Sequence, residues 1–226
     1  MSSLEFLRQV PLFQSLSKAD TEKLAAVLRR QSLKKGEALF RKGAEGTTLY
    51  IIAEGAIKIV LPSRMGSEVI LAIFSEGDFF GEMALLDGRP RSADAVALSP
   101  CEVLALNRRD FLAFLKNNEE AIRSILYSLS MRLRKTDDLL EDTCFLNISG
   151  RFAKKLVELA DTYGRREGDT ILIDLRLSQK DMASMVGATR ESINKEFRVL
   201  REKGLVSVTE STIRIHNLER LKRRIH

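Results

Sequence analysis

Apolar residues follow two different periods along the chain. Between residues 31 and 106, short runs rich in β-branched and aromatic side chains alternate with glycine turns, which predicts a β-barrel or β-sandwich. The expected strands are 38–40, 48–52, 56–60, 69–74, 93–97 and 102–106. Before them, Ser17 and Asp20 precede an amphipathic stretch and predict a capped helix over 18–30.

From Asn107 the pattern becomes helical. A short helix is expected over 108–115, followed by one long helix over 119–143 that contains no glycine or proline. Its apolar seam repeats in steps of four and three, as in a coiled coil, through Ile122, Leu126, Leu129, Leu133, Thr136, Leu140 and Thr143. This spacing predicts a two-stranded parallel coiled coil and hence a homodimer. The alternative is that the seam packs on the chain's own β domain.

The remaining segment predicts a winged helix-turn-helix. Residues 144–150 are expected to form a hinge, with Asn147 or Ser149 capping a helix over 151–163, a polar turn over 164–168 and a strand over 170–175. Ser178 with Asp181 caps a first helix, Gly187 makes the turn and Thr189 caps a second helix. A hairpin around 210–211 and a short basic helix over 218–225 complete the prediction.

Composition and charge restrict the class of protein. The 226 residues are 44% hydrophobic and 30% charged, which is typical of one or two globular domains. No apolar run approaches the roughly 18 residues of a membrane helix, and residues 1–10 carry no secretion signal, so we expect a cytoplasmic protein without a membrane partner. Residues 1–145 hold 20 basic and 20 acidic side chains, whereas residues 146–226 hold 17 and 11. The net +6 therefore lies in the C-terminal part and indicates a nucleic-acid surface, with a merely solvated basic face as the alternative.

Cysteine and histidine are scarce. Cys101 and Cys144 are far apart in sequence and form neither a disulfide framework nor a metal knuckle, so each is expected to be a small buried residue. His216 and His226 both lie near the C-terminus, and the β-rich segment has no histidine. We therefore expect no metal, haem or iron–sulfur cluster, and the histidine-rich metal site of a cupin enzyme is excluded.

The stretch over 77–95 has the composition of a phosphate cradle. Gly81 allows the backbone to approach a ligand closely, and Glu82 is an acceptor suited to a sugar hydroxyl. Arg91 and Ser92 supply a guanidinium fork and a hydroxyl for a phosphate. Taken alone, Gly81-Glu82 or Arg91-Ser92 could equally belong to an ordinary loop with a surface ion pair.

Two strings within this stretch strengthen that interpretation. Phe-Gly-Glu-Met-Ala-Leu-Leu over 80–86, followed by Arg-Pro-Arg-Ser-Ala over 89–93, resembles the phosphate-binding cassette of cyclic-nucleotide-binding domains. With the helix-turn-helix, the chain from Phe13 to about Arg223 resembles the cyclic-AMP receptor protein/fumarate-nitrate regulator (CRP/FNR) superfamily. It is nearer the cyclic-AMP branch, because the N-terminus lacks the cysteine cluster of the oxygen-sensing branch. The resemblance implies an α+β fold with a jelly-roll-like, cyclic-nucleotide-binding β-roll (1–116), a dimerisation helix and hinge (117–146) and a winged helix-turn-helix (147–226).

The resemblance also implies a ligand site. The effector would be cyclic AMP, with its phosphate on Arg91, Ser92 and the backbone after Gly81, and its ribose on Glu82. Thr136 would reach the adenine amine, and its neighbour Asp137 would contact the same base from the other subunit. Asp137 stands where the best-known members have Ser or Asn, and its acceptor-only carboxylate suits adenine better than guanine. The full expected set is Gly81, Glu82, Met83, Ala84, Arg91, Ser92, Thr136 and Asp137. Cyclic di-GMP, another effector or no effector stay open.

The second helix of the motif carries the expected base-reading side chains. Arginine suits the two acceptors of guanine, and glutamate accepts from the amine of cytosine. The expected DNA-binding residues are Ser178, Thr189, Arg190, Glu191, Asn194, Lys195 and Arg198. In the family resembled, Arg-Glu-x-x-x-Arg reads half-sites like GTGA in double-stranded two-fold operators; Lys195 replaces the last arginine. We expect a transcription regulator, an activator that also contacts RNA polymerase, rather than an enzyme. A regulatory module of a cyclic-nucleotide-dependent enzyme is the other class considered.

Overall fold

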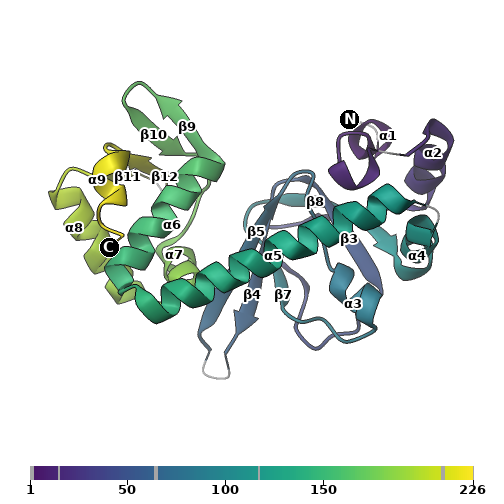
Figure 1. Cartoon of the computed structure of the whole chain (residues 1–226), viewed down its shortest axis with the longest axis horizontal. Coiled ribbons are helices and arrows are strands. Elements are labelled where there is room, and N and C mark those ends of the chain that lie inside the picture. The colour runs from purple at the N-terminus through teal and green to yellow at the C-terminus, as the bar shows by residue number, and fades with distance from the viewer. Residues whose placement is uncertain (1–2, 15, 64–65, 117, 210–211, 226) are drawn as a thin grey trace. The chain divides into compact units, whose positions relative to one another are not determined.

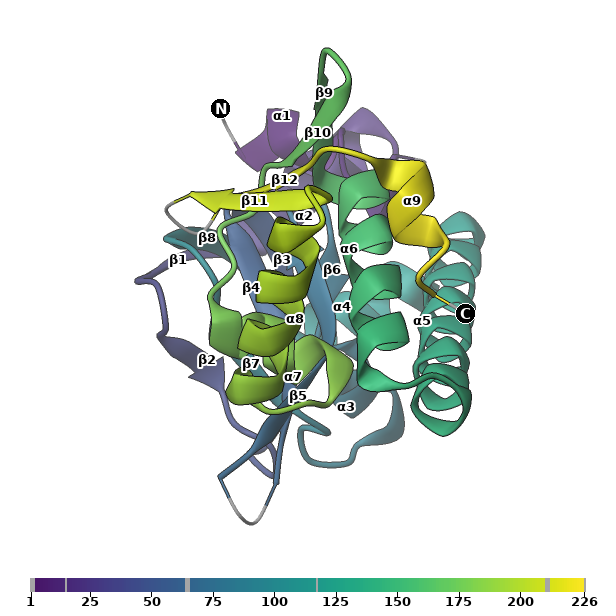
Figure 2. The same cartoon turned by 90° about the vertical axis from the view of Figure 1, so that its left-hand side faces the viewer.

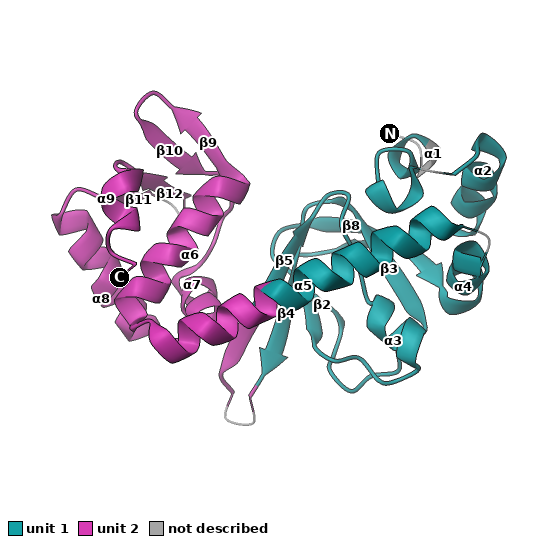
Figure 3. Ribbon diagram, viewed as in Figure 1, with its two compact units in different colours: residues 1–62, 71–134 teal, residues 63–70, 135–226 magenta. Residues whose placement is uncertain are grey.

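The chain forms two compact units. The computed structural model describes residues 3–14, 16–63, 66–116, 118–209 and 212–225. The first unit covers residues 1–62 and 71–134, and the second covers 63–70 and 135–226 (Figure 3). The division within the long helix thus falls between Arg134 and Lys135.

Two sheets make up most of the first unit (Figure 1). Their strand orders are β1-β8-β3-β6 and β2-β7-β4-β5. The strands are β1 (Arg29–Leu33), β2 (Ala38–Phe40), β3 (Thr48–Glu54), β4 (Ala56–Pro62), β5 (Glu68–Ser75), β6 (Phe79–Phe80), β7 (Asp94–Ala97) and β8 (Cys101–Asn107). All the expected strands are confirmed. Strands β1 and β6 were not predicted, because β1 is polar at four of its five positions and β6 has only two residues.

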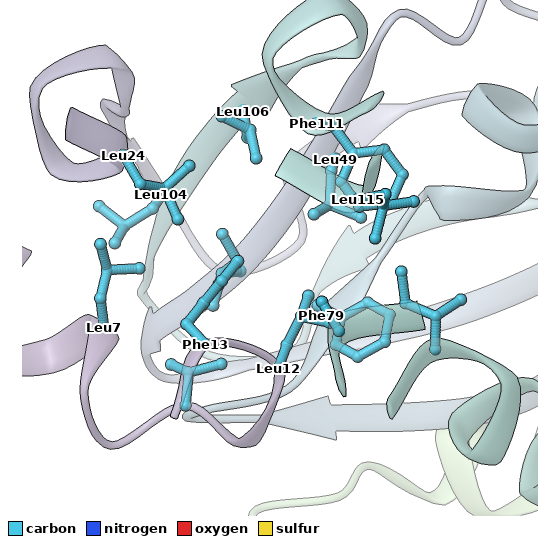
Figure 4. Packing of buried hydrophobic residues seen from close by; sticks show 14 of the residues in the cluster. Leu7, Leu12, Phe13, Leu24, Leu49, Phe79, Leu104, Leu106, Phe111 and Leu115 are labelled. Atoms are coloured by element: carbon cyan, nitrogen blue, oxygen red, sulfur yellow. The ribbon is translucent and has the colours of Figure 1, made fainter. Parts of the chain in front are cut away.

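Helices close one face of the first sheet. They are α1 (Ser3–Leu7), the 3₁₀ helix η1 (Pro11–Phe13), α2 (Lys18–Val27), α4 (Arg108–Lys116) and the first part of α5 (Glu119–Phe145). Helix α2 ends before residue 30, where its prediction placed the end, because Arg29 already pairs with β8. Figure 4 shows Phe13, Phe79 and Phe111 in the cluster between these helices and the sheet. Successive strand residues face opposite sides, so Ile51 enters this cluster and Ile52 enters the core of the β-roll.

The long helix exposes most of its seam in the single chain. Leu126, Leu133 and Leu140 are 58%, 63% and 64% exposed, whereas Ala121 and Ile125, which lie off the seam, are buried against the chain's own β domain. Of the seam, Leu129 also packs on that domain. The seam therefore does not find its main partner within the described part of the β domain.

The second unit is a helix-turn-helix flanked by a sheet. It contains α6 (Ile148–Tyr163), α7 (Gln179–Val186), α8 (Arg190–Glu202) and α9 (Leu218–Lys222). The sheet order is β11-β12-β10-β9, formed by β9 (Gly164–Glu167), β10 (Thr170–Ile173), β11 (Val206–Thr209) and β12 (Thr212–Ile215). The prediction of a polar turn over 164–168 was wrong, because residues 164–167 pair with β10 as a strand. The hairpin turn expected at 210–211 lies outside the described residues.

Capping residues set the geometry of the helix-turn-helix as expected. Ser178 and Asp181 form a capping box at α7, Gly187 ends that helix with a φ of 61°, and Thr189 caps α8. Ile193, Phe197 and Leu200 are buried, and α8 packs against α6 and α7 (Figure 2). Asn147, one of the two candidates, caps α6. In the described residues, no helix is long and apolar enough to span a membrane.

Candidate functional site

The 77–95 stretch folds as a strand, a short helix and a loop. Gly81 links β6 to helix α3 (Glu82–Asp87) with a φ of 86°, a conformation that favours glycine. A Cβ atom on Gly81 would lie 2.6 Å from Arg91 Nη1. Glycine is thus required both by the backbone conformation and by the close approach of the guanidinium group.

Arg91 lies beneath this turn and is only 5% exposed. Its Nη1 donates to the Gly81 carbonyl at 2.8 Å and its Nη2 to the Thr48 carbonyl at 2.6 Å. The guanidinium carbon lies 4.2 Å from the centroid of the Phe40 ring. Burial lowers the pKa of Arg91, although the guanidinium stays charged at neutral pH. A fixed cation is therefore built into the cassette.

The loop over 41–47 covers the same arginine. Its backbone pairs with the cassette, since Gly43 N donates to Arg91 O and Arg91 N donates to Ala44 O, both at 2.8 Å. Asp94 accepts from Arg41 Nη1 and from the backbone of Lys42, each at 2.7 Å. The loop is thus tied to strand β7 and to the cassette at the same time.

Glu82 forms an ion pair that the sequence did not reveal. Its side chain is buried, and Oε1 accepts a 2.7 Å hydrogen bond from Arg132 Nη1 on α5. Arg132 also donates to the Phe79 carbonyl and lies 4.5 Å from the centroid of the Phe74 ring. Oε2 of Glu82 is buried and has no hydrogen-bond partner among the described residues. The site therefore holds a carboxylate with one oxygen satisfied and one oxygen left over.

The other expected ligand residues differ in their surroundings. Ser92 is exposed, and among the described residues its hydroxyl donates a hydrogen bond only to the Met83 sulfur, at 3.8 Å. Ala84 is buried. Thr136 and Asp137 are exposed and lie on the part of α5 that belongs to the second unit. The structure thus brings Gly81, Glu82 and Arg91 together in the first unit, with Met83, Ala84 and Ser92 beside them.

Helix α8 presents a polar face. Its Arg190, Glu191, Asn194, Lys195 and Arg198 are all exposed, on the side opposite to its buried core positions. The cap residues Ser178 and Thr189 are exposed too, although their hydroxyls already accept from the backbone N–H groups of Asp181 and Ser192. Guanidinium, ammonium, amide and carboxylate groups at this spacing are suited to the edges of bases and to phosphates.

The described residues contain no group of three or more His, Cys, Asp or Glu side chains placed to hold a metal ion. Burial raises the pKa of the Cys101 thiol to about 11. Cys101 is buried as expected, whereas Cys144 is exposed near the end of α5, so its prediction as a buried residue was wrong.

Known proteins match both halves of the chain. The family described as "Cyclic nucleotide-binding domain" matches residues 30–118, and the "Crp-like helix-turn-helix domain" matches residues 150–224. The "CRP-like cAMP-activated global transcriptional regulator" of Mycobacterium tuberculosis is 30% identical over 97% of this chain and 98% of its own length. The "Cyclic AMP receptor protein" of Thermus thermophilus is 31% identical over 91% and 92% of the two chains.

Solved structures share the fold. The c-di-GMP-responsive regulator CLP of Xanthomonas campestris superposes with a TM-score of 0.77 at 23% identity, covering 89% of this chain and 100% of that one. A CRP-family regulator from Thermus thermophilus gives a TM-score of 0.73 at 26% identity, covering 86% and 96%. The α+β fold expected from the sequence, with its β-roll, long helix and winged helix-turn-helix, is confirmed.

Proposed function

Because this chain belongs to the CRP/FNR family of transcription regulators, we propose that it is a homodimer whose binding to double-stranded DNA is controlled by cyclic AMP. The observation that carries the effector part is the buried Oε2 of Glu82, which has no partner among the described residues. Buried polar atoms in proteins are nearly always hydrogen-bonded. A hydroxyl group of a bound ribose would supply the missing donor.

The phosphate would bind beside Arg91. Its guanidinium group uses one N–H of each terminal nitrogen on a backbone carbonyl, and its Nε has no partner among the described residues. Further N–H bonds thus remain for an anion. The exposed hydroxyl of Ser92 and the backbone N–H groups of Met83 and Ala84 would complete the cradle. A fixed, partly desolvated cation with hydroxyl and amide donors is the environment in which a phosphate is bound without a metal.

Adenine is the base that suits the remaining residues. Thr136 would contact its amine from the same subunit, and Asp137 of the partner subunit would accept a hydrogen bond from the same group. The carboxylate of Asp137 only accepts, so the carbonyl of guanine would be repelled. The relatives from Mycobacterium tuberculosis and Thermus thermophilus, whose names mention cyclic AMP, support this choice.

A ligand that contacts both subunits can control DNA binding. It has different contacts in two arrangements of the dimer, and that difference is what shifts an equilibrium. In the binding arrangement the two α8 helices would lie about one DNA turn apart, ~34 Å, in successive major grooves. Arg190, Glu191 and Lys195 would read each half of a two-fold site. The bound dimer would act in the cytoplasm, as an activator that contacts RNA polymerase and without enzyme activity of its own.

A second candidate is the same fold under another effector, such as cyclic di-GMP, or without any effector. The Glu82–Arg132 ion pair favours it, because Arg132 already satisfies one carboxylate oxygen without a ligand. In this case cyclic AMP would not change the affinity for DNA.

Selection from a library of randomised double-stranded DNA, followed by fluorescence anisotropy on the selected sites, tests the proposal. We expect cyclic AMP to tighten binding to selected sites, by fivefold or more for coupling of typical size, about 1–3 kcal/mol. Arg190→Ala should relax the base preference within each half-site by roughly 1–3 kcal/mol. Arg201→Ala, in the last turn of the same helix, is the control. Selected sites without two-fold symmetry, or affinity indifferent to cyclic AMP, would contradict the proposal.

A further inference from the structure

The junction between the long helix and the DNA-binding unit is held by side chains. Helices α5 and α6 are separated only by Leu146 and Asn147. Lys154, in the second turn of α6, forms a 2.6 Å ion pair with Asp142, in the last turn of α5. The side chains of Asp142 and Lys154 are 14% and 30% exposed, so the pair is largely shielded from water.

A second cation extends this link into the helix-turn-helix. Arg151 Nη1 donates to the Leu146 carbonyl at 2.9 Å, and its Nε donates to the Val186 carbonyl at 3.0 Å. Leu146 belongs to the junction, and Val186 is the last residue of α7, directly before the turn to α8. One guanidinium group thus joins the junction, α6 and the reading motif.

The junction also leaves little free space. The Asn147 side chain accepts from Gly150 N at 2.9 Å, and a Cβ atom on Gly150 would lie 2.8 Å from the Ile225 carbonyl oxygen. The C-terminal segment therefore packs directly on the start of α6. The residues predicted as a hinge are tied on several sides within the second unit.

We propose that Asp142 and Lys154 are positioning residues for DNA recognition, which fix the last turn of α5 to α6 and, through Arg151, to α7 and α8. The inference rests on the proposed function, because it assumes that α8 reads DNA in a dimer joined through α5. In such a dimer the spacing of two recognition helices must match one DNA turn. If the junction between α5 and α6 is firm, any shift of the two α5 helices of the dimer also moves the two α8 helices.

The charges around Lys154 keep this link closed at neutral pH. Burial lowers the pKa of Lys154, but the hydrogen bond that Lys154 donates to Asp142 and the negative charges of Asp142, Glu158 and Asp138 outweigh it and raise the pKa overall. Lys154 is therefore a cation at neutral pH. Replacing only one member of the pair leaves a partly buried charge without its partner, which destabilises the folded state more than replacing both members.

The test compares Lys154→Met with Lys155→Met. Lys155 is the matched control, because it pairs with Glu158 inside α6 and forms no ion pair with α5 among the described residues. Hydrogen exchange in the absence of ligand should become faster over residues 139–150 in Lys154→Met only. The affinity for two-fold DNA should fall about tenfold, while cyclic AMP affinity measured without DNA changes less than twofold.

Two further variants keep the result decisive. Asp142→Asn preserves the shape of the junction and should give a smaller loss in the same direction. The exchanged pair Asp142→Lys with Lys154→Asp should restore both exchange and DNA affinity. Equal effects of the two lysine variants, or unchanged exchange over 139–150, would overturn the inference. A wild-type chain that binds no DNA would instead refute the proposed function, and the exchange measurement would still decide whether the pair closes the junction.

Discussion

Arg132 and Glu82, fifty residues apart in sequence, meet through a 2.7 Å hydrogen bond between Nη1 and Oε1. The pair joins α5 to the first residue of α3, and both residues lie in the first unit. Glu82 is thereby held in one orientation, with Oε2 left over for a donor that the described residues do not supply. The buried Glu82 side chain thus has a cation from another element as its partner.

Arg132→Met should destabilise the first unit by about 3 kcal/mol, because it leaves the Glu82 carboxylate buried without its partner. Adding Glu82→Gln should recover most of that loss, since a neutral amide costs less to bury. Urea unfolding of the wild type, both single variants and the double variant measures the coupling. Additive effects of the two substitutions would contradict the ion pair.

Ser92→Ala should lower cyclic-nucleotide affinity about tenfold without changing stability, since the only hydrogen bond of the exposed Ser92 hydroxyl among the described residues is to the Met83 sulfur. Arg91→Ala should lose affinity and stability together, because it also strips the carbonyls of Gly81 and Thr48 of their donors. Calorimetry and thermal unfolding of both variants separate the two effects. Unchanged cyclic-nucleotide affinity in Ser92→Ala would show that the Ser92 hydroxyl does not bind the phosphate.

Leu133→Glu should convert the dimer to a monomer, because Leu133 is 63% exposed on the seam and like charges would face each other in a parallel pair. Leu112→Glu is the control, since Leu112 is 40% exposed on α4 and lies off the seam. Sedimentation equilibrium gives the mass of each variant. A wild-type monomer, or a dimer that survives Leu133→Glu, would argue against the seam.

Alkylation should modify Cys144 before Cys101. Burial raises the pKa of Cys101 to about 11, so the folded state keeps this thiol protonated between about pH 8 and 9, where an ordinary thiol begins to ionise. The same shift means that Cys101 costs stability as the pH rises above its unfolded pKa. Mass spectrometry after iodoacetamide treatment should find Cys101 labelled only in urea. Equal labelling of both cysteines in the folded protein would contradict its burial.

Short-range signals predicted most of the fold. Ser17, Ser178 and Thr189 all cap helices as expected, because an N-cap depends on residues within one turn. The glycine turns and apolar alternation located the strands in the same way. Strand β1 was not predicted, because Arg29 and Arg30 adopt a strand conformation through pairing with β8, more than seventy residues away. Such pairing leaves no local pattern.

The candidate site was predicted in part. The string around Gly81 and Arg91 is contiguous, so its residues could be identified together. Arg132 lies on another element, α5, and outside that string. Its spacing of four residues from Thr136 places both on one face of α5, and that signal could have found it. The contact between Asp142 and Lys154 joins two consecutive helices, and it depends on how the chain turns between them, so it needed the three-dimensional structure.

Calorimetric titration of the purified dimer with cyclic AMP, cyclic GMP and cyclic di-GMP tests the central claim most directly. The account predicts tight binding of cyclic AMP alone at one nucleotide per chain. It also predicts a loss of about tenfold or more in Glu82→Gln, whose neutral amide accepts a hydrogen bond from the ribose less strongly. Absence of heat from cyclic AMP, or equal affinity in Glu82→Gln, would contradict the assignment of the buried carboxylate to the effector.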